Sequence, residues 1–341
     1  AAHTDGATRA RIEALMSIGL LGRPRVAGDR IFSMRRQADE EQSALLVRQG
    51  DEGEPRVLVD PTDLGERVAI DWYFASPSGR YVAVGLSEQG DERSVLRVLE
   101  VDSGEEVPGQ RIERCKWATV AWLHDESGFY YTRYPREGEE GFREDQPDSY
   151  FPRIFFHRLG SDPAEDELVY GADERDDFPW PSVSEDGRWL VVNVFRGWAR
   201  SDVSLLVRSA EGAVLQTVPE GCDCLVSGEV RRGRLWLMSN EDHPRYRILA
   251  VDPGAATDRS AWQEIVPESE ATIDGFEVAG ERLVVHDIHR YASRLRLVGL
   301  DGSDAGAIEL PTNGSIAGLG GQPGSREVAF VFSSFFYPPT L

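Results

Sequence analysis

The sequence has few cysteines and no long apolar run, and these shortages exclude several classes of protein. Three cysteines (Cys115, Cys222 and Cys224) cannot form a disulfide framework for 341 residues. The Cys222-Asp223-Cys224 segment has no second cysteine pair and no histidine at zinc-finger spacing, so we expect reduced thiols in a cytoplasmic protein. No segment approaches the roughly 20 consecutive apolar residues of a membrane-spanning helix. The N-terminal AAHTDGATRAR lacks an initiator methionine and a hydrophobic signal core, which indicates a processed or excised chain.

Positive charge, and lysine above all, is also scarce. Asp and Glu outnumber Lys and Arg by 59 to 37, which leaves a formal net charge of −22. A phosphate backbone or an anionic lipid surface would repel such a chain, so neither nucleic acid nor membranes are expected as partners. Lys116 is the only lysine, and the other 36 basic residues are arginines. This pattern is typical of GC-rich genomes and salt-adapted surfaces, and it leaves the reaction class open.

One segment, from Thr8 to Leu21, has the periodicity of a helix. Its apolar residues recur at helical spacing, at Ile12, Leu15, Met16 and Leu20. Gly22 and Pro24 are expected to end it, so residues 1–24 are predicted to form a helix and a linker. Everything afterwards consists of short β-type runs separated by Gly, Asp, Ser and Pro turns.

A glycine-containing turn followed by a short apolar strand recurs seven times in residues 25–341. The glycines are Gly28, Gly79, Gly128, Gly187, Gly233, Gly280 and Gly324, spaced 44 to 59 residues apart. Further strand-like runs, such as VLRVLEVD and YRILAVD, lie between successive turns. A period of this length with several strands per unit is typical of a β-propeller. We therefore predict an all-β, seven-bladed propeller whose blades open near these glycines.

The last predicted blade is incomplete. After Gly324, one long strand (EVAFVFSSFF) and a Tyr337-Pro338-Pro339 turn precede the final residue, Leu341. A natural domain seldom ends inside a hairpin, because the strand edge would stay unpaired. We therefore expect further chain after Leu341.

Motifs that would indicate catalysis are absent. The sequence contains no G-x-S-x-G, H-E-x-x-H, P-loop or paired C-x-x-C motif, so no catalytic residue and no cofactor can be named. His286 and His289 are three apart on a predicted strand and should point to opposite faces, which argues against a shared metal ion. The repeat motifs of sialidases and WD40 propellers are also missing, and kelch double glycines occur only at residues 320–321.

Several aromatic residues lie in predicted loops. Trp117 is in ERCKWATVAW, Phe178 and Trp180 are in DDFPWP, and Trp198 is in FRGWARSD. Such residues either pack between blades or line a pocket for an apolar peptide side chain.

The sequence resembles the β-propeller domain of prolyl oligopeptidase, a serine peptidase that cuts short peptides after proline. The resemblance runs from about Thr8 to Leu341. Its most specific segments, in family order, are residues 71–92, 121–135, 155–170, 239–252 and 333–341.

The resemblance implies a propeller inserted into an α/β-hydrolase domain that carries the Ser-Asp-His triad, so this chain alone should be inactive. It implies that the propeller restricts access to short proline-containing peptides. It also implies that Trp117, Phe178 and Trp198 contact the substrate. The alternatives are a free-standing propeller that acts as a binding scaffold, or another propeller enzyme such as a glycan-processing one. The reading frame beyond Leu341 would distinguish the peptidase propeller from the free-standing scaffold.

Overall fold

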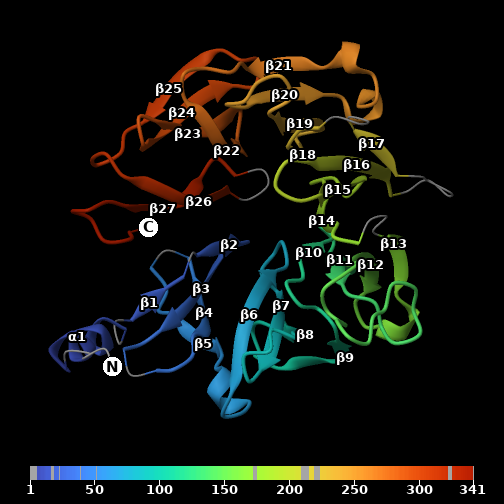
Figure 1. Cartoon of the computed structure of the whole chain (residues 1–341), viewed down its shortest axis with the longest axis vertical. Helices are drawn as coiled ribbons and strands as arrows, with labels where there is room; N and C mark the ends of the chain where they lie inside the picture. The colour runs from blue at the N-terminus through green and yellow to red at the C-terminus, as the bar shows by residue number, and fades with distance from the viewer. Residues whose placement is uncertain are drawn as a thin grey trace. The chain divides into compact units, whose positions relative to one another are not determined.

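The computed structural model describes residues 6–16, 19–22, 24–38, 40–50, 52–171, 175–208, 215–218, 223–321 and 325–340. The chain divides into two compact units, Ala1–Glu113 and Arg114–Leu341. Within each unit the strands form antiparallel sheets, and most strands pair with their neighbours in the chain (Figure 1).

The first unit contains two sheets in its described part. One has five strands, in the order β1-β3-β4-β5 with β2 also paired to β3, and the other has the order β6-β7-β8-β9. The elements are α1 (Gly6–Met16), β1 (Leu20–Leu21), β2 (Arg25–Ala27), β3 (Arg30–Arg36), β4 (Ala44–Gln49), β5 (Arg56–Val59), η1 (Pro61–Asp63), β6 (Val68–Ala75), β7 (Tyr81–Glu88), β8 (Val95–Glu100) and β9 (Glu106–Ile112).

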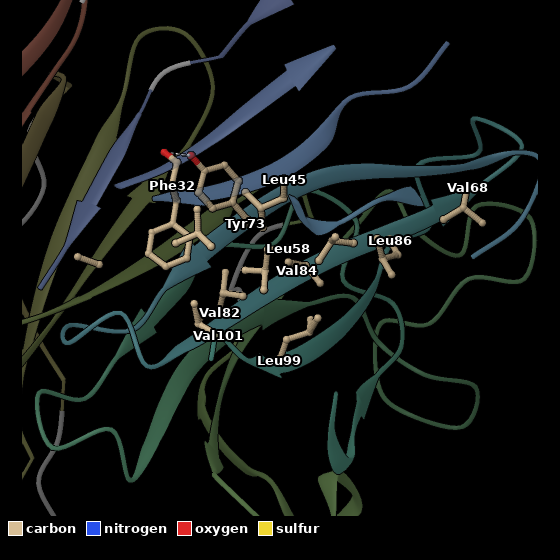
Figure 2. Close-up of a cluster of buried hydrophobic side chains, with 13 residues drawn as sticks. Phe32, Leu45, Leu58, Val68, Tyr73, Val82, Val84, Leu86, Leu99 and Val101 are labelled. Atoms are coloured by element: carbon tan, nitrogen blue, oxygen red, sulfur yellow. Dashed lines mark hydrogen bonds between the residues drawn. The ribbon is translucent and has the colours of Figure 1, made fainter. Parts of the chain in front are cut away.

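The core of this unit lies between its two sheets. Phe32 and Leu45 from the first sheet pack in one cluster with Val82 and Val84 from the second, and all four are fully or almost fully buried (Figure 2). Tyr73 belongs to the same cluster and donates its hydroxyl to the Phe32 carbonyl at 3.3 Å. Because each side chain of this size contributes roughly 1.5–3 kcal/mol when fully buried, the cluster accounts for much of the attraction between the sheets.

The N-terminal helix is shorter than the sequence predicted. It ends at Met16, and Leu20 and Leu21 form strand β1, paired with Arg36 and Arg35 of β3. Gly19 explains part of the difference, because glycine inside a helix costs about 1 kcal/mol relative to alanine. Pairing with β3 also provides backbone partners for the two leucines.

The second unit contains four sheets of four strands and one of two strands among its described residues. The first strand of each sheet lies toward the inside of this unit (Figure 1). The elements are β10 (Val120–Trp122), β11 (Gly128–Arg133), β12 (Arg153–Arg158), η2 (Pro163–Glu165), β13 (Glu167–Tyr170), β14 (Phe178–Val183), β15 (Trp189–Phe195), β16 (Ser201–Val207), β17 (Gln216–Val218), β18 (Val226–Arg231), β19 (Arg234–Ser239), β20 (Arg247–Val251), η3 (Pro253–Ala255), η4 (Arg259–Ala261), β21 (Gln263–Val266), β22 (Thr272–Ala279), β23 (Arg282–His289), β24 (Ala292–Gly299), β25 (Asp304–Ile308), β26 (Ser315–Gly321) and β27 (Val328–Ser333).

The repeated glycines lie where a sheet's first hairpin turns. Gly79, for example, has a φ of +73° between β6 and β7, and Gly187 has a φ of +67° between β14 and β15. Such positive φ values explain why the repeat needs glycine there. Gly128 differs, because it is the first residue of β11, and Gly324 lies outside the described residues. Each sheet therefore begins one strand before its glycine.

Neighbouring sheets of the second unit are joined where a third strand starts. Ser201, which begins β16, donates its N–H to the Cys224 carbonyl at 2.9 Å and its hydroxyl to the Val226 carbonyl at 2.6 Å. Ser293, near the start of β24, donates its N–H to the Gly314 carbonyl at 2.9 Å. Its Oγ accepts the N–H of Ile316, the second residue of β26 in the next sheet, at 2.9 Å.

Two other pairs of neighbouring sheets in this unit are also joined where a third strand starts. Phe151, just before β12, donates its N–H to Arg175, just before β14, at 3.0 Å. Ile273 of β22 donates its N–H to the carbonyl of Arg245, just before β20, also at 3.0 Å. We call this end of the second unit the clasp end. It carries the starts of β10, β14, β18, β22 and β26, and the glycine turns lie at the opposite end.

Candidate functional site

The three residues predicted to contact substrate all lie at the clasp end of the second unit. Phe178 is the first residue of β14, Trp198 lies in the β15–β16 loop, and Trp117 lies in the turn before β10. The sheets that carry Trp117 and Phe178 are neighbours. Thr132 joins them, because its hydroxyl donates to the Pro179 carbonyl at 3.2 Å and lies 2.9 Å from that of Thr119.

Phe178 and Trp198 are connected through Phe195, a residue that the sequence analysis did not single out. The register of β14 and β15 places Phe178 opposite Phe195. The Phe195 and Trp198 rings meet edge to face, with centroids 6.2 Å apart and planes at 87°. Trp198 is 94% exposed, so it offers an open apolar surface. The sequence pattern showed that Phe195 ends a strand, but only the register shows what it faces.

A salt-bridge network holds this part of the site in place. Arg196 donates from Nη1 to Asp177 and from Nε to Asp202, each at 2.6 Å, and both carboxylates are almost fully buried. Burial opposes the charge of Arg196, but hydrogen bonding to Asp202 and the nearby Asp177 together raise its pKa. The Arg196 N–H also donates to the Arg200 carbonyl at 2.9 Å, which closes the loop that carries Trp198.

Trp117 is held in a strained turn that presents its ring to solvent. Its φ is +51°, and the Ala118 N–H donates to the Cys115 carbonyl at 3.1 Å. The side chain is 56% exposed, and Lys116 Nζ lies 4.6 Å from its ring centroid. A bulky residue seldom adopts such a backbone conformation, so the turn is strained at Trp117.

A long loop, residues 134–152, lies next to this turn and is tied down by arginines. Arg133 donates from both Nη atoms to Glu139, each at 2.8 Å. The hydrogen bonds from Arg133 lower the pKa of Glu139 to about 2, against the effect of burial. Arg114 forms an ion pair with Asp148 at 3.0 Å. The loop is therefore fixed at both ends of its course.

Comparison with known proteins identifies this fold. Residues 2–341 match the family model for the N-terminal β-propeller domain of prolyl oligopeptidase. The chain belongs to this family. A prolyl endopeptidase of Elizabethkingia meningoseptica is 23% identical over 309 residues, which cover 87% of this chain and 42% of that protein.

Solved structures of prolyl oligopeptidases share the fold. The structure from a study of two prolyl endopeptidases and their inter-domain dynamics has a TM-score of 0.87 and 30% identity, over 98% of this chain and 49% of that one. Prolyl oligopeptidase B from Galerina marginata, bound to a 25mer macrocyclization substrate, has a TM-score of 0.84 and 18% identity, over 98% and 50%. The predicted all-β, seven-bladed propeller with a short N-terminal helix is thus confirmed. The chain spans about half the length of these relatives.

One Ser-His-Asp arrangement occurs in the described part of this propeller, but its serine makes hydrogen bonds that join two neighbouring sheets. Ser293 Oγ lies 2.9 Å from His286 Nε2, and His286 Nδ1 lies 3.2 Å from Asp274. Burial lowers the pKa of His286, although nearby carboxylates oppose this. Ser201 makes the same cross-sheet bonds at the equivalent place, with backbone groups of Cys224 and Val226 as its partners. Ser293 therefore serves to join two sheets.

The cysteines differ from the prediction. Cys115 is a fully buried thiol that forms no disulfide, but Cys224 is disulfide-bonded, so the expectation of reduced thiols is wrong for Cys224. Cys222 lies outside the described residues. The cytoplasmic location that rested partly on these thiols stays a prediction.

The described ranges contain no group of three or more His, Cys, Asp or Glu side chains that could hold a metal ion. Among the helices in the same ranges, none has the length and apolar character needed to span a bilayer.

A small cavity of about 210 Å³ lies between the inner strands of three blades of the second unit. Trp180, Glu229 and Phe276 contribute to its lining. Glu229 forms an ion pair with Arg231, with 3.0 Å between Oε2 and Nη2. Burial and then the charge of Glu229 raise the pKa of Glu277, on the neighbouring β22, to about 7, although Arg231 opposes this. Two carboxylates thus compete for one arginine.

This pair should make stability depend on pH. A folded-state pKa raised from 4.5 to about 7 means that the folded chain holds a proton that the unfolded chain has lost, so stability falls as the pH rises through this window. In urea unfolding, the unsubstituted chain should lose about 2 kcal/mol of unfolding free energy between pH 5 and pH 8 because of this group. Glu277→Gln should remove most of that loss. Glu281→Gln, at an exposed carboxylate on the next turn, is the control. Equal pH slopes for both variants would contradict the assignment.

Proposed function

We propose that this propeller is part of a proline-specific serine endopeptidase, where it restricts the active site to short peptides and supplies pocket residues. The observation that supports this most directly is the gathering of Trp117, Phe178, Phe195 and Trp198 at one end of two neighbouring blades. Exposed aromatic surface of this kind suits an apolar peptide side chain.

In this proposal the chain's own residues bind and orient the peptide, and the hydrolase domain supplied by the parent chain breaks the bond. Trp198 and Phe195 would provide an apolar wall, and Arg196 would hold that wall rigid through its two buried carboxylates. A pre-organised wall loses little side-chain entropy when the substrate binds. The relative from Galerina marginata is bound to a 25mer macrocyclization substrate, which supports an oligomeric substrate as the ligand.

Comparing the activity of the isolated chain with that of the complete parent protein tests the proposal. The isolated chain should neither cleave a proline-amide reporter nor react with a serine-directed phosphonate, whereas the complete parent protein should do both. A stop codon directly after Leu341 with no partner hydrolase gene would instead support a free-standing binding scaffold. Phosphonate labelling of Ser293 in the isolated chain would show that this serine is a nucleophile and that the chemistry has been misplaced.

Pocket residues should affect a substrate position upstream of proline. In the complete enzyme, Trp117→Ala or Phe178→Ala should lower kcat/KM for substrates with a large apolar residue there. The loss should correspond to roughly 1–3 kcal/mol of transition-state binding free energy, because apolar contact area is lost. Substrates with glycine at the same position should be cleaved almost as well as before. Leu168→Ala, at an exposed residue of β13, is the matched control. Unchanged kinetics for both aromatic substitutions would remove these residues from the pocket.

A further inference from the structure

The cavity between the inner strands of the second unit is large enough to hold one side chain of a ligand. Its volume is about 210 Å³. A cavity of roughly 150 Å³ is enough for a benzene ring, whereas pockets for drug-sized ligands measure roughly 300–1,000 Å³. The cavity therefore has room for a single long or planar side chain, but not for a whole peptide.

Aromatic and acidic residues share the lining of this cavity. Trp180 comes from β14, Glu229 from β18 and Phe276 from β22, so three neighbouring blades each contribute one of these residues. Met238 of β19 adds a polarisable thioether. The face of an aromatic ring attracts a cation, and a carboxylate forms its strongest hydrogen bonds with one. This combination of residues suits a positively charged group.

The wall of the cavity on β18 is fixed before any ligand binds. Asn193 of β15 is buried and lines the cavity together with Gly228 of β18. Its Nδ2 donates to the Gly228 carbonyl at 3.1 Å, and its Oδ1 accepts the Gly228 N–H at 2.7 Å. These two bonds hold the inner edge of β18 against the preceding sheet. A ligand that enters a pre-formed cavity loses little free energy in ordering its walls.

Gly275 leaves the opposite wall without a side chain. It lies in β22 where the pairing register with β23 shifts between Ile273 and Gly275. Apart from its two chain neighbours, no atom of a described residue lies within 4 Å of where its Cβ would be, and its φ is outside the left-handed region. Another residue could therefore replace Gly275 without a clash, and its side chain would take up space that is now open.

The charge near Glu229 is negative on balance. Burial raises the pKa of Glu229, the charge of Arg231 opposes this, and the nearby Glu185 adds to it. Arg231 also acts on Glu277, the third carboxylate of this group. Three carboxylates thus share one arginine, and a second cation would offset the charge that Arg231 leaves uncompensated.

The cavity also lies within reach of the candidate site. Phe178 and Trp180 are two residues apart on β14, so their side chains point to the same face with roughly 7 Å of strand between them. A peptide that contacts Phe178 can therefore place a neighbouring residue at Trp180.

We propose that this cavity binds an arginine side chain of the peptide substrate, upstream of the residue that contacts Phe178, an inference that rests on the proposed function. Trp180 and Phe276 contact the planar guanidinium, and Glu229 accepts its hydrogen bonds. Lysine suits the cavity less well, because an ammonium group is more strongly hydrated and has no planar face to stack on a ring.

The test measures kcat/KM of the complete enzyme on a panel of proline reporters that carry one arginine at each upstream position in turn. A matched panel carries citrulline, which keeps the size and planar shape of arginine but not its charge. At one position the arginine reporter should have a kcat/KM about tenfold higher than the citrulline reporter. The gain should come mainly from a lower KM, because the contact is far from the reacting bond and stabilises substrate and transition state alike.

Two substitutions assign this preference to the cavity. Glu229→Gln removes the charge, and Gly275→Leu fills the open space. Each should reduce the arginine-to-citrulline ratio of kcat/KM to about one. Glu281→Gln, at an exposed carboxylate outside the cavity lining, is the control and should keep the ratio of the unsubstituted enzyme. Near-ultraviolet circular dichroism checks that all three variants keep the native fold.

The outcomes separate this subsite from the proposed function. Equal kcat/KM for arginine and citrulline at every position, in an active prolyl peptidase, would overturn the arginine subsite and leave the proposed function intact. An arginine preference that persists in both Glu229→Gln and Gly275→Leu would place the recognition elsewhere and also overturn the subsite. A complete protein without prolyl peptidase activity would overturn both.

Discussion

Replacing Asp166 by alanine should lower the free energy of unfolding by about 4 kcal/mol, since breaking a buried charged network typically costs 3–5 kcal/mol. Asp166 lies just before β13, and its side chain is only 3% exposed. It accepts the Tyr131 hydroxyl at 2.7 Å, and its other oxygen lies 2.7 Å from Nδ1 of His157. Tyr131 and His157 are both fully buried. The substitution therefore takes an acceptor from two groups that water cannot easily reach.

Asp166→Asn is the informative control for this network. It keeps the shape and one acceptor oxygen for Tyr131, so it should cost less than half as much as alanine. Asp162→Ala, which removes an exposed cap that accepts the Ala164 N–H at 2.9 Å, should cost about 1 kcal/mol. Urea unfolding of the three variants measures these differences. A loss below about 1 kcal/mol for Asp166→Ala would mean that the network contributes little, because that is the scale of one ordinary hydrogen bond.

Asp287→Ala should have the second largest effect, a loss of about 3 kcal/mol. The Asp287 side chain is fully buried on β23 and accepts Nε of Arg294 at 2.8 Å and Nε of Arg296 at 2.5 Å. The two arginines are 44% and 32% exposed, so they can turn to water once the carboxylate is gone. That partial escape makes the expected cost smaller than for Asp166.

Single substitutions of the arginines separate the two contacts. Arg294→Gln should cost less than about 1 kcal/mol, because Arg294 is well exposed and Arg296 keeps the carboxylate paired. Arg296→Gln should cost more, since Arg296 is less exposed and makes the shorter contact. Thermal unfolding compares the variants. Asp287→Ala that melted at the same temperature as the unsubstituted protein would contradict this account.

Much of the fold could be predicted because its signals are local. Five of the seven recurring glycines have the positive φ that their hairpin turns need, and they recur because the blades repeat the same hairpin. The start of each blade was less visible, because the first strand precedes its glycine and carries no marker of its own. The helix boundary failed for a related reason: Leu20 and Leu21 fit a helical spacing, but pairing with β3 overrides it.

The candidate site was predictable only in part. Trp117, Phe178 and Trp198 were singled out through a family resemblance, and their assignment to a pocket stays a prediction. Phe195 was missed because its relation to Phe178 depends on the register of two strands. The role of Arg196 was also hidden, since one arginine among many has no mark in the sequence until its two carboxylates are located.

The sequence by itself determined the class of architecture and the family, because turn spacing, strand alternation and motif order are properties of neighbouring residues. It also determined the acidic surplus, which is a matter of composition alone. Only the tertiary structure decided which strand ends meet, and therefore which aromatic residues share the clasp end. It also decided which few of the 59 acidic residues are buried against partners. Such partners come from strands far apart in the chain, and burial is what makes their contacts strong.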